Sequence, residues 1–436
     1  MSQYPRFQKE FESFIDERSK KEPSWMRSIR EKAFLRFSQL GFPTRKNEDW
    51  KYSKTTAIEK IPFQMATQNK TSFDKQTLQE IIDLELGKNY IVFIDGYYNE
   101  ALSSTESLPK GVIVTSMMKA IESGNESLQA HLMKQSERDD DRMFAMLNLA
   151  FFTDGVFVDI SENTVLDEPI HLIFVVSDDE RSQVIQSRNV IVAGKFSRAE
   201  ILESYVGQTE RSYWTNMATE LELAPTAKVG HIKFQNEPQE GVHLSHLYAH
   251  LNRDSHFSNY SLFFGGKFAR NDVVAFLGSE GINCTVNGLY IANNKQHIDN
   301  RTFIDHAFPH CNSNELYKGI LDDRGSGVFN GRIIVRQDAQ QTDAQQSNQA
   351  LLLSDNARIY NKPQLEIFAD DVKCTHGAAT GRLDSAAMFF LRSRGLTEEK
   401  AKHLLTFAFA NEILTQIPNQ AIQDSLETLL AKKLNK

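Results

Sequence analysis

A thiol and an imidazole stand two residues apart in the last quarter of the chain, at Cys374 and His376. Thiolate and neutral imidazole are ligands that iron and other transition metals accept. Successive side chains of a β-strand point to opposite faces, so Val372, Cys374 and His376 would share one face of a strand. In the competing interpretation, Cys374 is a small apolar filler and His376 closes a turn before Gly377.

The elements around this pair indicate how it is positioned. A β-type run, Leu365–Ala369, leads into Asp370 and Asp371, and the apolar side chains change from odd to even positions there. This change of phase predicts a corner in the chain at the two aspartates. Downstream, Asp384 is a candidate N-cap for a helix that Gly395 ends.

Two further clusters carry residue types that can bind metals. Both lack the HExxH or CxxC spacing that would complete a zinc site, so satisfied core or loop histidines are the favoured interpretation. In a helix His243, His246 and His250 would share a face, whereas in a strand only His246 and His250 would. The clusters are His243, His246 and His250, and His306, His310 and Cys311 in IDHAFPHC.

Motifs for nucleotide hydrolysis and acyl transfer are missing from the sequence. Gly265-Gly266-Lys267 lacks the upstream glycine and the following hydroxyl of a P-loop, and no GxSxG elbow occurs. We therefore expect that the chain is not an enzyme and does not hydrolyse nucleotide itself.

Composition excludes several classes of partner. The formal net charge of −8 argues against a general nucleic-acid binder, and no apolar run approaches the roughly 18 residues of a membrane span. The charged N-terminus lacks the apolar core of a signal peptide, and three cysteines without paired spacing make a disulfide framework unexpected. These features predict a cytoplasmic protein without a membrane or nucleic-acid partner.

The pattern of residue types along the sequence divides the chain into three parts. Residues 1–155 form a helical and mixed N-terminal domain, residues 156–382 are short β-rich runs without helices between them, and residues 383–436 are helical. The middle part predicts a sandwich or barrel, or else a β-helix, and periodicity leaves both open. Asn293-Asn294 and Asp299-Asn300 fit the turns of such coils.

Three smaller segments carry interpretations of their own. The segment from Arg45 to Ser53 is interpreted as an N-capped segment anchored by Trp50 and Tyr52, or as a docking element. The Gln-rich stretch 337–349 is interpreted as a solvent-facing turn rather than a linker. In the C-terminal helices, His403, Leu404, Phe407, Ala408 and Ile413 are expected to form one apolar stripe.

The chain closely resembles the SufB/SufD family of scaffold subunits in the SUF iron–sulfur cluster assembly machinery. The resemblance rests on ADDVKCTHGAATGRLD followed by MFFLRSRGL, on HIDNRTFIDHAFPHCNSNELYKGILDDRGSGVFNGRIIV upstream, and on NEDWKYS near the N-terminus. It covers most of the chain, most densely from about residue 240 to 396. It implies a mainly β fold with a right-handed parallel β-helix core.

The same resemblance implies partners and a site. The chain would pair with SufB through the edge of the β-helix and bind the SufC ATPase through its C-terminal helices. Whether the isolated chain forms a homodimer is left open by the sequence. A transient iron–sulfur cluster would be shared with SufB, with His376 as the proposed ligand, Cys374 as its neighbouring thiol, and no cluster held tightly by this chain alone.

Departures from the SufB pattern point to the SufD side of the family. SufB-type chains typically have HEAT where His376-Gly377-Ala378-Ala379 stands here, and a Cys near Asn348. The missing carboxylate and thiol make this chain the poorer ligand donor. The competing functions are an exported polysaccharide-acting β-helix enzyme and a purely structural partner without a cluster ligand.

Overall fold

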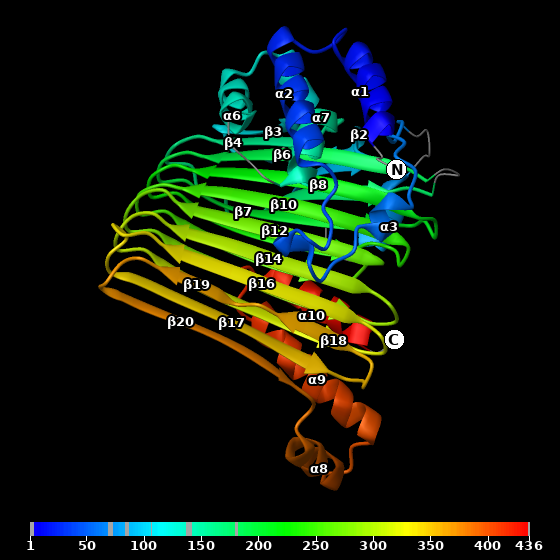
Figure 1. Cartoon of the computed structure of the whole chain (residues 1–436), viewed down its shortest axis with the longest axis vertical. Helices are drawn as coiled ribbons and strands as arrows, with labels where there is room; N and C mark the ends of the chain where they lie inside the picture. Colours follow the sequence, from blue (N-terminus) through cyan, green and yellow to red (C-terminus); the bar gives the residue numbers. More distant parts are fainter. Residues whose placement is uncertain are drawn as a thin grey trace.

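The protein is described from a computed structural model, which covers residues 4–68, 73–82, 87–105, 107–136, 142–178 and 182–434. Its body is a parallel β-helix of about 8 turns with helices at both ends of the chain (Figure 1). This confirms the mainly β class and the β-helix that the family resemblance implies, and it excludes the sandwich and the barrel.

Two sheets form the walls of the β-helix. Successive core strands from β4 to β18 alternate between them, and β18 and β19 both lie in sheet A. Sheet A has the order β18-β16-β14-β12-β10-β8-β6-β4-β3, with β19 also paired to β16, and sheet B has the order β2-β1-β5-β7-β9-β11-β13-β15-β17-β20. Core strands pair in parallel with the strand one coil away, as β10 does with β8 and β12. The core strands are β4 (Val156–Ile160), β5 (Ile170–Val176), β6 (Val184–Ala193), β7 (Arg198–Gly207), β8 (Tyr213–Leu223), β9 (Lys228–Asn236), β10 (Gly241–Leu251), β11 (His256–Phe263), β12 (Phe268–Leu277), β13 (Asn283–Ala292), β14 (His297–His306), β15 (Asn312–Leu321), β16 (Ser326–Val335), β17 (Thr342–Leu352), β18 (Arg358–Asn361), β19 (Gln364–Ile367) and β20 (Val372–Gly381).

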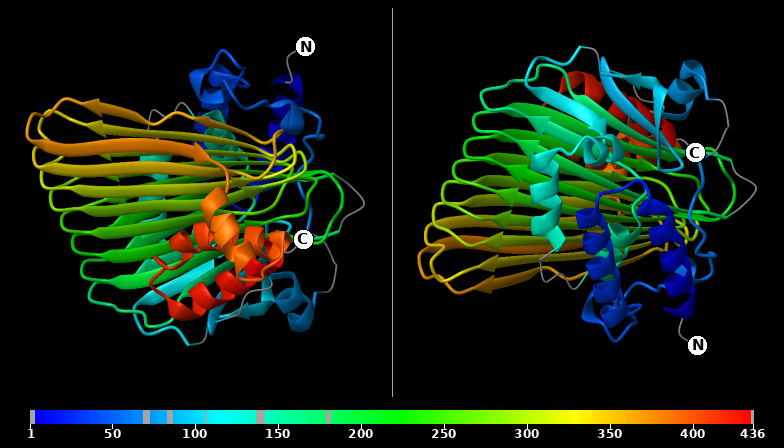
Figure 2. Two further views of the ribbon diagram at one scale, coloured as in Figure 1. Left: turned by 90° about the horizontal axis from the view of Figure 1, so that it is seen from below. Right: turned by 90° about the horizontal axis from the view of Figure 1, so that it is seen from above.

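The N-terminal region covers the outer face of sheet A and the first coils (Figures 1 and 2). Its strands lie before Val156 yet join the core sheets, because β1 pairs with β5 and β3 pairs with β4. Its elements are α1 (Tyr4–Arg18), α2 (Ser24–Leu40), the 3-10 turn η1 (Glu48–Trp50), α3 (Thr56–Glu59), α4 (Lys75–Ile82), β1 (Asn89–Ile94), β2 (Tyr97–Ser104), β3 (Val112–Ser116), α5 (Met117–Glu122), α6 (Glu126–Ser136) and α7 (Met143–Phe151).

The segment from Asn47 to Ser53 docks the N-terminal region onto sheet A. Trp50 is buried, and the Arg270 guanidinium of β12 lies 4.0 Å above its ring. Arg270 also donates to the backbone oxygen of Asp49 and to the Asp299 carboxylate. Asn47 does not cap η1 with its side chain, so the anchoring by Trp50 is confirmed and the capping is wrong.

Corners of the coils use residues that tolerate positive φ. Asn294 has φ 52°, which confirms the turn predicted at Asn293-Asn294. The turn predicted at Asp299-Asn300 is wrong, because both residues lie buried inside β14. The buried charge of Asp299 is satisfied by Arg270 and by the hydroxyl of Ser53, contacts that no local pattern reveals.

The C-terminal helices are α8 (Ser385–Ser393), α9 (Glu398–Leu414) and α10 (Gln420–Leu434). Helices α9 and α10 pack on the outer face of sheet B, whereas α8 stands beyond the last coil and buries no residue (Figures 1 and 2). The predicted apolar stripe of α9 is partly wrong: Ile413 is buried, but Leu404 is 46% exposed. No helix within the described ranges is long and apolar enough to cross a membrane.

Candidate functional site

The last strand of sheet B, β20, leaves one edge of the β-helix open. It pairs with β17 and is the terminal strand in the order of its sheet. From Thr375 to Gly381 each of its residues is exposed. An edge strand presents unpaired backbone N–H and C=O groups that can pair with another chain. The end of the β-helix is therefore a surface on which a further strand can be added.

Cys374 and His376 lie on this strand and share one face, as the alternation predicted. Cys374 lies opposite Ala344 and is half-buried against the core, whereas His376 lies opposite Gln346 and is exposed. The bend at Asp370 and Asp371 confirms the predicted corner. Strand β20 continues to Gly381, so the interpretation of His376 as a residue that closes a turn is wrong.

The column of side chains beneath His376 is polar. In successive coils His376 lies over Gln346, and Gln346 lies over Glu315. Gln346 and Glu315 are both buried, and Gln346 Nε2 donates to Glu315 Oε2 at 2.7 Å. The Gln-rich stretch interpreted as a solvent-facing turn is therefore wrong from Thr342 onward, where it forms β17 and places amides inside the β-helix.

Burial raises the pKa of Glu315 to about 7. Because this value lies above the ordinary carboxyl pKa, folding favours the protonated acid, and stability is lost as the pH rises through 7. We expect Glu315→Gln to gain stability relative to the wild type from pH 5 to pH 8, by on the order of 3 kcal/mol. Urea unfolding at each pH measures this difference.

The matched control for this experiment is Glu162→Gln, which makes the same chemical change at an exposed carboxylate. Its difference from the wild type should stay nearly constant over the same pH range. A Glu315→Gln difference that is equally flat would contradict a carboxylic acid that titrates near neutral pH inside the coil.

The two candidate ligands differ in their readiness to bind a metal. Burial raises the pKa of the Cys374 thiol above its ordinary value, which disfavours the thiolate that binds metals. The imidazole of His376 stands in solvent on the open edge. In the isolated chain His376 is therefore the accessible donor, and Cys374 is the weaker one.

The other histidines make protein contacts instead of converging on a metal. His246 Nδ1 lies 3.3 Å from the Asp272 carboxylate, and His250 Nδ1 lies 2.6 Å from Glu222. His306 Nε2 lies 2.9 Å from the hydroxyl of Ser313. In the described ranges no three His, Cys, Asp or Glu side chains are arranged to hold a metal ion.

Several large apolar residues near β20 are exposed, which the sequence did not predict. Phe368 is 61% exposed beside the corner, and Phe389 and Phe390 of α8 are 75% and 56% exposed. The signal available for α8 was the MFFL run, residues 388–391, which begins four residues after the capping Asp384 and places four large apolar residues around one short helix. Groups of large exposed apolar side chains are typical of binding surfaces.

The sequence of this chain matches two models of one protein family. Residues 1–172 match the family model for the SufBD protein N-terminal region, and residues 174–409 match the SufBD core domain of SUF system FeS cluster assembly. A SufBD family protein of Synechocystis is 33% identical over 89% of this chain and 86% of its own length. Escherichia coli SufD is 28% identical over 91% of this chain and 90% of its own length, and the chloroplastic protein ABCI7 of Arabidopsis thaliana is 27% identical over 92% and 84%.

The two family matches together span nearly all of the described chain, from the N-terminal helices to α9. The matched ranges include the β-helix, the edge strand β20, α8 and most of α9. The chain belongs to the SufBD family, and it functions in iron–sulfur cluster assembly in the SUF system.

Proposed function

We propose that this chain is a non-catalytic scaffold subunit that holds one side of a nascent iron–sulfur cluster through His376. The observation that carries the proposal is the exposed imidazole on the edge strand β20, which pairs with β17 on one side and is the terminal strand of its sheet. A ligand at such an edge lies where a second chain would add its own strand, so the cluster would form between the two chains.

The donor set of the chain supports a shared site. Iron in Fe–S clusters accepts thiolate and, in some clusters, imidazole. Here one exposed imidazole has one half-buried thiol beside it, which is fewer donors than a cluster requires. The partner would supply the remaining ligands, and this chain alone would bind no cluster tightly. Its cluster is cargo that leaves after assembly.

SufB is the proposed partner at β20, with a homodimer of this chain as the arrangement when SufB is absent. Strand addition uses the free backbone amides of the edge. Successive amides of a strand point to opposite sides, so one of Ala378 and Ala379 donates toward β17 and the other toward the open edge. Proline removes a single amide and is tolerated on an edge strand only where that amide faces outward.

We therefore expect one of the variants Ala378→Pro and Ala379→Pro to weaken SufB binding and the other to lower the stability of the chain. One variant should keep the wild-type Tm and bind SufB about tenfold more weakly, since it loses an interchain hydrogen bond and distorts the edge. The other should lower Tm, because it breaks a bond to β17. Thermal unfolding and titration with purified SufB measure both effects. Wild-type SufB affinity in the variant that keeps its Tm would exclude β20 as the interface.

The helices of residues 383–436 are proposed as the SufC-binding domain. Helix α8 extends beyond the last coil (Figure 1). Its Phe389 and Phe390 side chains are exposed to solvent. The chain has no P-loop, so ATP hydrolysis would come from SufC. Co-expression with SufB and SufC tests the whole proposal: it should give a stable complex with an iron–sulfur chromophore, and a complex without the chromophore would contradict it.

The absence of a disulfide among the three cysteines supports a cytoplasmic location for this assembly. Cys284, Cys311 and Cys374 are all free thiols, as expected in a reducing compartment. The half-burial of Cys374 favours a packing role for that thiol, so the purely structural alternative retains support at this one position. The β-helix fits the exported polysaccharide-acting enzyme as well, but the family matches favour cluster assembly over that alternative.

A further inference from the structure

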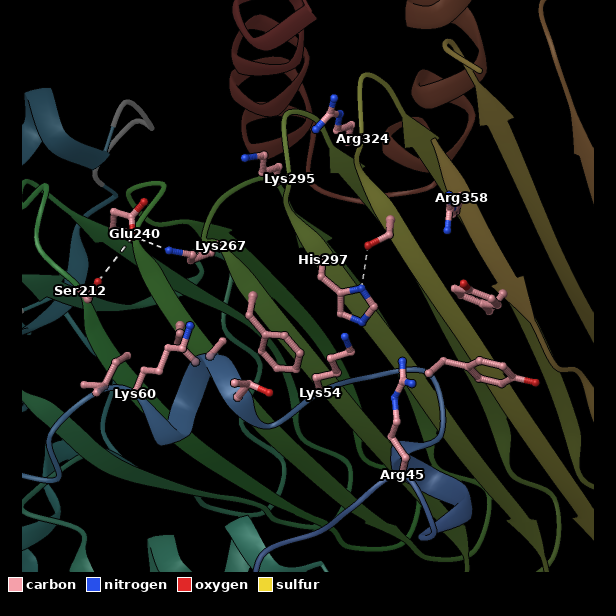
Figure 3. Close-up of a pocket in the computed structure, with 18 of the residues that line it drawn as sticks. Arg45, Lys54, Lys60, Ser212, Glu240, Lys267, Lys295, His297, Arg324 and Arg358 are labelled. Carbon is pink, nitrogen blue, oxygen red and sulfur yellow. Dashed lines mark hydrogen bonds and ion pairs between the residues drawn. The ribbon is translucent and has the colours of Figure 1, made fainter. Parts of the chain in front are cut away.

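A large cavity lies between the N-terminal segment that crosses sheet A and one corner of the β-helix (Figure 3). Its volume is about 1020 Å³. One wall is the segment from Arg45 to Pro62, which includes α3, and the other is formed by the residues that precede or begin the strands of sheet A from β6 to β18. No residue of β20 lines it, so it is separate from the proposed cluster site.

The lining of this cavity is strongly basic in an acidic protein. Seven cationic side chains contribute to it, and Glu240 is the single acidic residue among the lining residues. Glu240 forms an ion pair with Lys267 at 2.7 Å. Within the described residues the six other cations have no ion-pair partner: Arg45, Lys54, Lys60, Lys295, Arg324 and Arg358.

The fold generates a row of these charges. Lys267, Lys295, Arg324 and Arg358 come from four successive coils, at or just before the starts of β12, β14, β16 and β18. Adjacent parallel strands are about 4.8 Å apart, so the row presents a positive charge at nearly every coil. Lys54 and Lys60 face this row from the N-terminal segment (Figure 3).

Uncompensated like charges around one hollow repel one another and create a strong local field. The net charge of −8 makes such a concentration of cations unexpected on a random part of this surface. Arginine and lysine that converge in this way are the side chains that recognise phosphate groups, arginine by paired N–H donors and lysine as a point charge. An anion with several charges would therefore be stabilised here.

The rest of the lining matches a ligand with an uncharged body. Tyr52 and Tyr360 stack with ring centroids 4.7 Å apart, and Phe268, Ile61 and Pro62 add apolar surface. A cavity of this size holds a ligand larger than inorganic phosphate. We propose that this cavity binds a multiply phosphorylated small molecule of the nucleotide class, with its phosphates on the row of cations and its ring system near the tyrosines.

Calorimetric titration of the purified full-length chain, without iron and at low salt, tests the proposal with three probes. ADP should bind more tightly than pyrophosphate, and pyrophosphate more tightly than inorganic phosphate. Pyrophosphate adds a second phosphate for the row of cations, and ADP adds a ring system for the apolar part of the cavity. Affinity should fall as salt is added. A wild-type chain that binds neither ADP nor pyrophosphate, or that binds phosphate as tightly as ADP, would overturn the proposal.

The matched variants remove two positive charges each. Lys295→Gln/Arg324→Gln should lower the affinity for ADP at least tenfold. The control Lys195→Gln/Arg198→Gln, at an exposed corner of another coil, should leave the affinity for ADP unchanged. Equal losses in both would show general charge attraction and overturn a specific site. If the first variant folds poorly, acetylation of the wild type decides instead: ADP should protect Lys54, Lys60 and Lys295 but not Lys195, and equal protection of all four would overturn the site.

Discussion

Replacing His376 by alanine is expected to reduce cluster assembly in the complete complex by at least tenfold. Loss of a partner that only orients a ligand typically costs 10–100-fold in metal affinity, so loss of a ligand itself should cost no less. His376 is exposed and makes no core contact, so the fold should remain intact, with a change of about 0.5 kcal/mol or less in unfolding free energy. Iron and sulfide content of the anaerobically purified complex measures the effect.

The matched control is Thr375→Ala, one residue away on the opposite face of β20. It should retain wild-type cluster content, because its side chain points away from the proposed site. Cys374→Ala should have a smaller effect than His376→Ala, since burial raises the pKa of the Cys374 thiol and disfavours its thiolate. Normal assembly in His376→Ala would leave the structural alternative standing.

Replacing both aromatic residues of α8, Phe389→Ser/Phe390→Ser, is expected to weaken SufC binding more than 100-fold. These side chains are 75% and 56% exposed, and covering them in a complex would contribute roughly 3 kcal/mol together. Since α8 buries no residue in this chain, the variant should keep the wild-type Tm. Titration of the purified variant with SufC provides the measurement.

The control for α8 is Phe308→Ser, which removes a 44% exposed phenylalanine on a turn of the β-helix. It should bind SufC like the wild type. If Phe389→Ser/Phe390→Ser also binds like the wild type, SufC docks elsewhere on the chain.

Local chemistry predicted the parts of the fold that depend on neighbours in sequence. The alternation of Val372, Cys374 and His376 is confirmed, as are the bend at Asp370-Asp371 and the cap, where the Asp384 carboxylate accepts from the Ala386 amide at 2.9 Å. Each of these depends on dihedral preferences or on a hydrogen bond within a few residues.

Features that depend on the stacking of coils were not predictable in this way. Glu315, Gln346 and His376 are about 30 residues apart in sequence, and only the parallel register places them in one column. The Gln-rich stretch looked like a turn because its polarity is typical of solvent, yet the coil buries Gln346 against a protonatable acid. Burial of Asp299 by Arg270 depends equally on a partner from another coil.

The basic cavity escaped the sequence analysis for the same reason. Its cations are spread from Arg45 to Arg358, and the overall acidic composition conceals them. No window of the sequence is basic enough to predict an anion site. The repeat of the β-helix collects one charge from each of several coils, and the N-terminal segment adds three more.

In the proposed function, His376 contributes a ligand to a cluster shared with SufB. Pulsed EPR on the reduced complex, assembled from this chain with ¹⁵N-labelled histidine and unlabelled SufB and SufC, tests it directly. We expect a ¹⁵N coupling from one coordinated histidine in the wild type and its disappearance in His376→Gln. A cluster without a ¹⁵N coupling, or one whose coupling persists in His376→Gln, would contradict it.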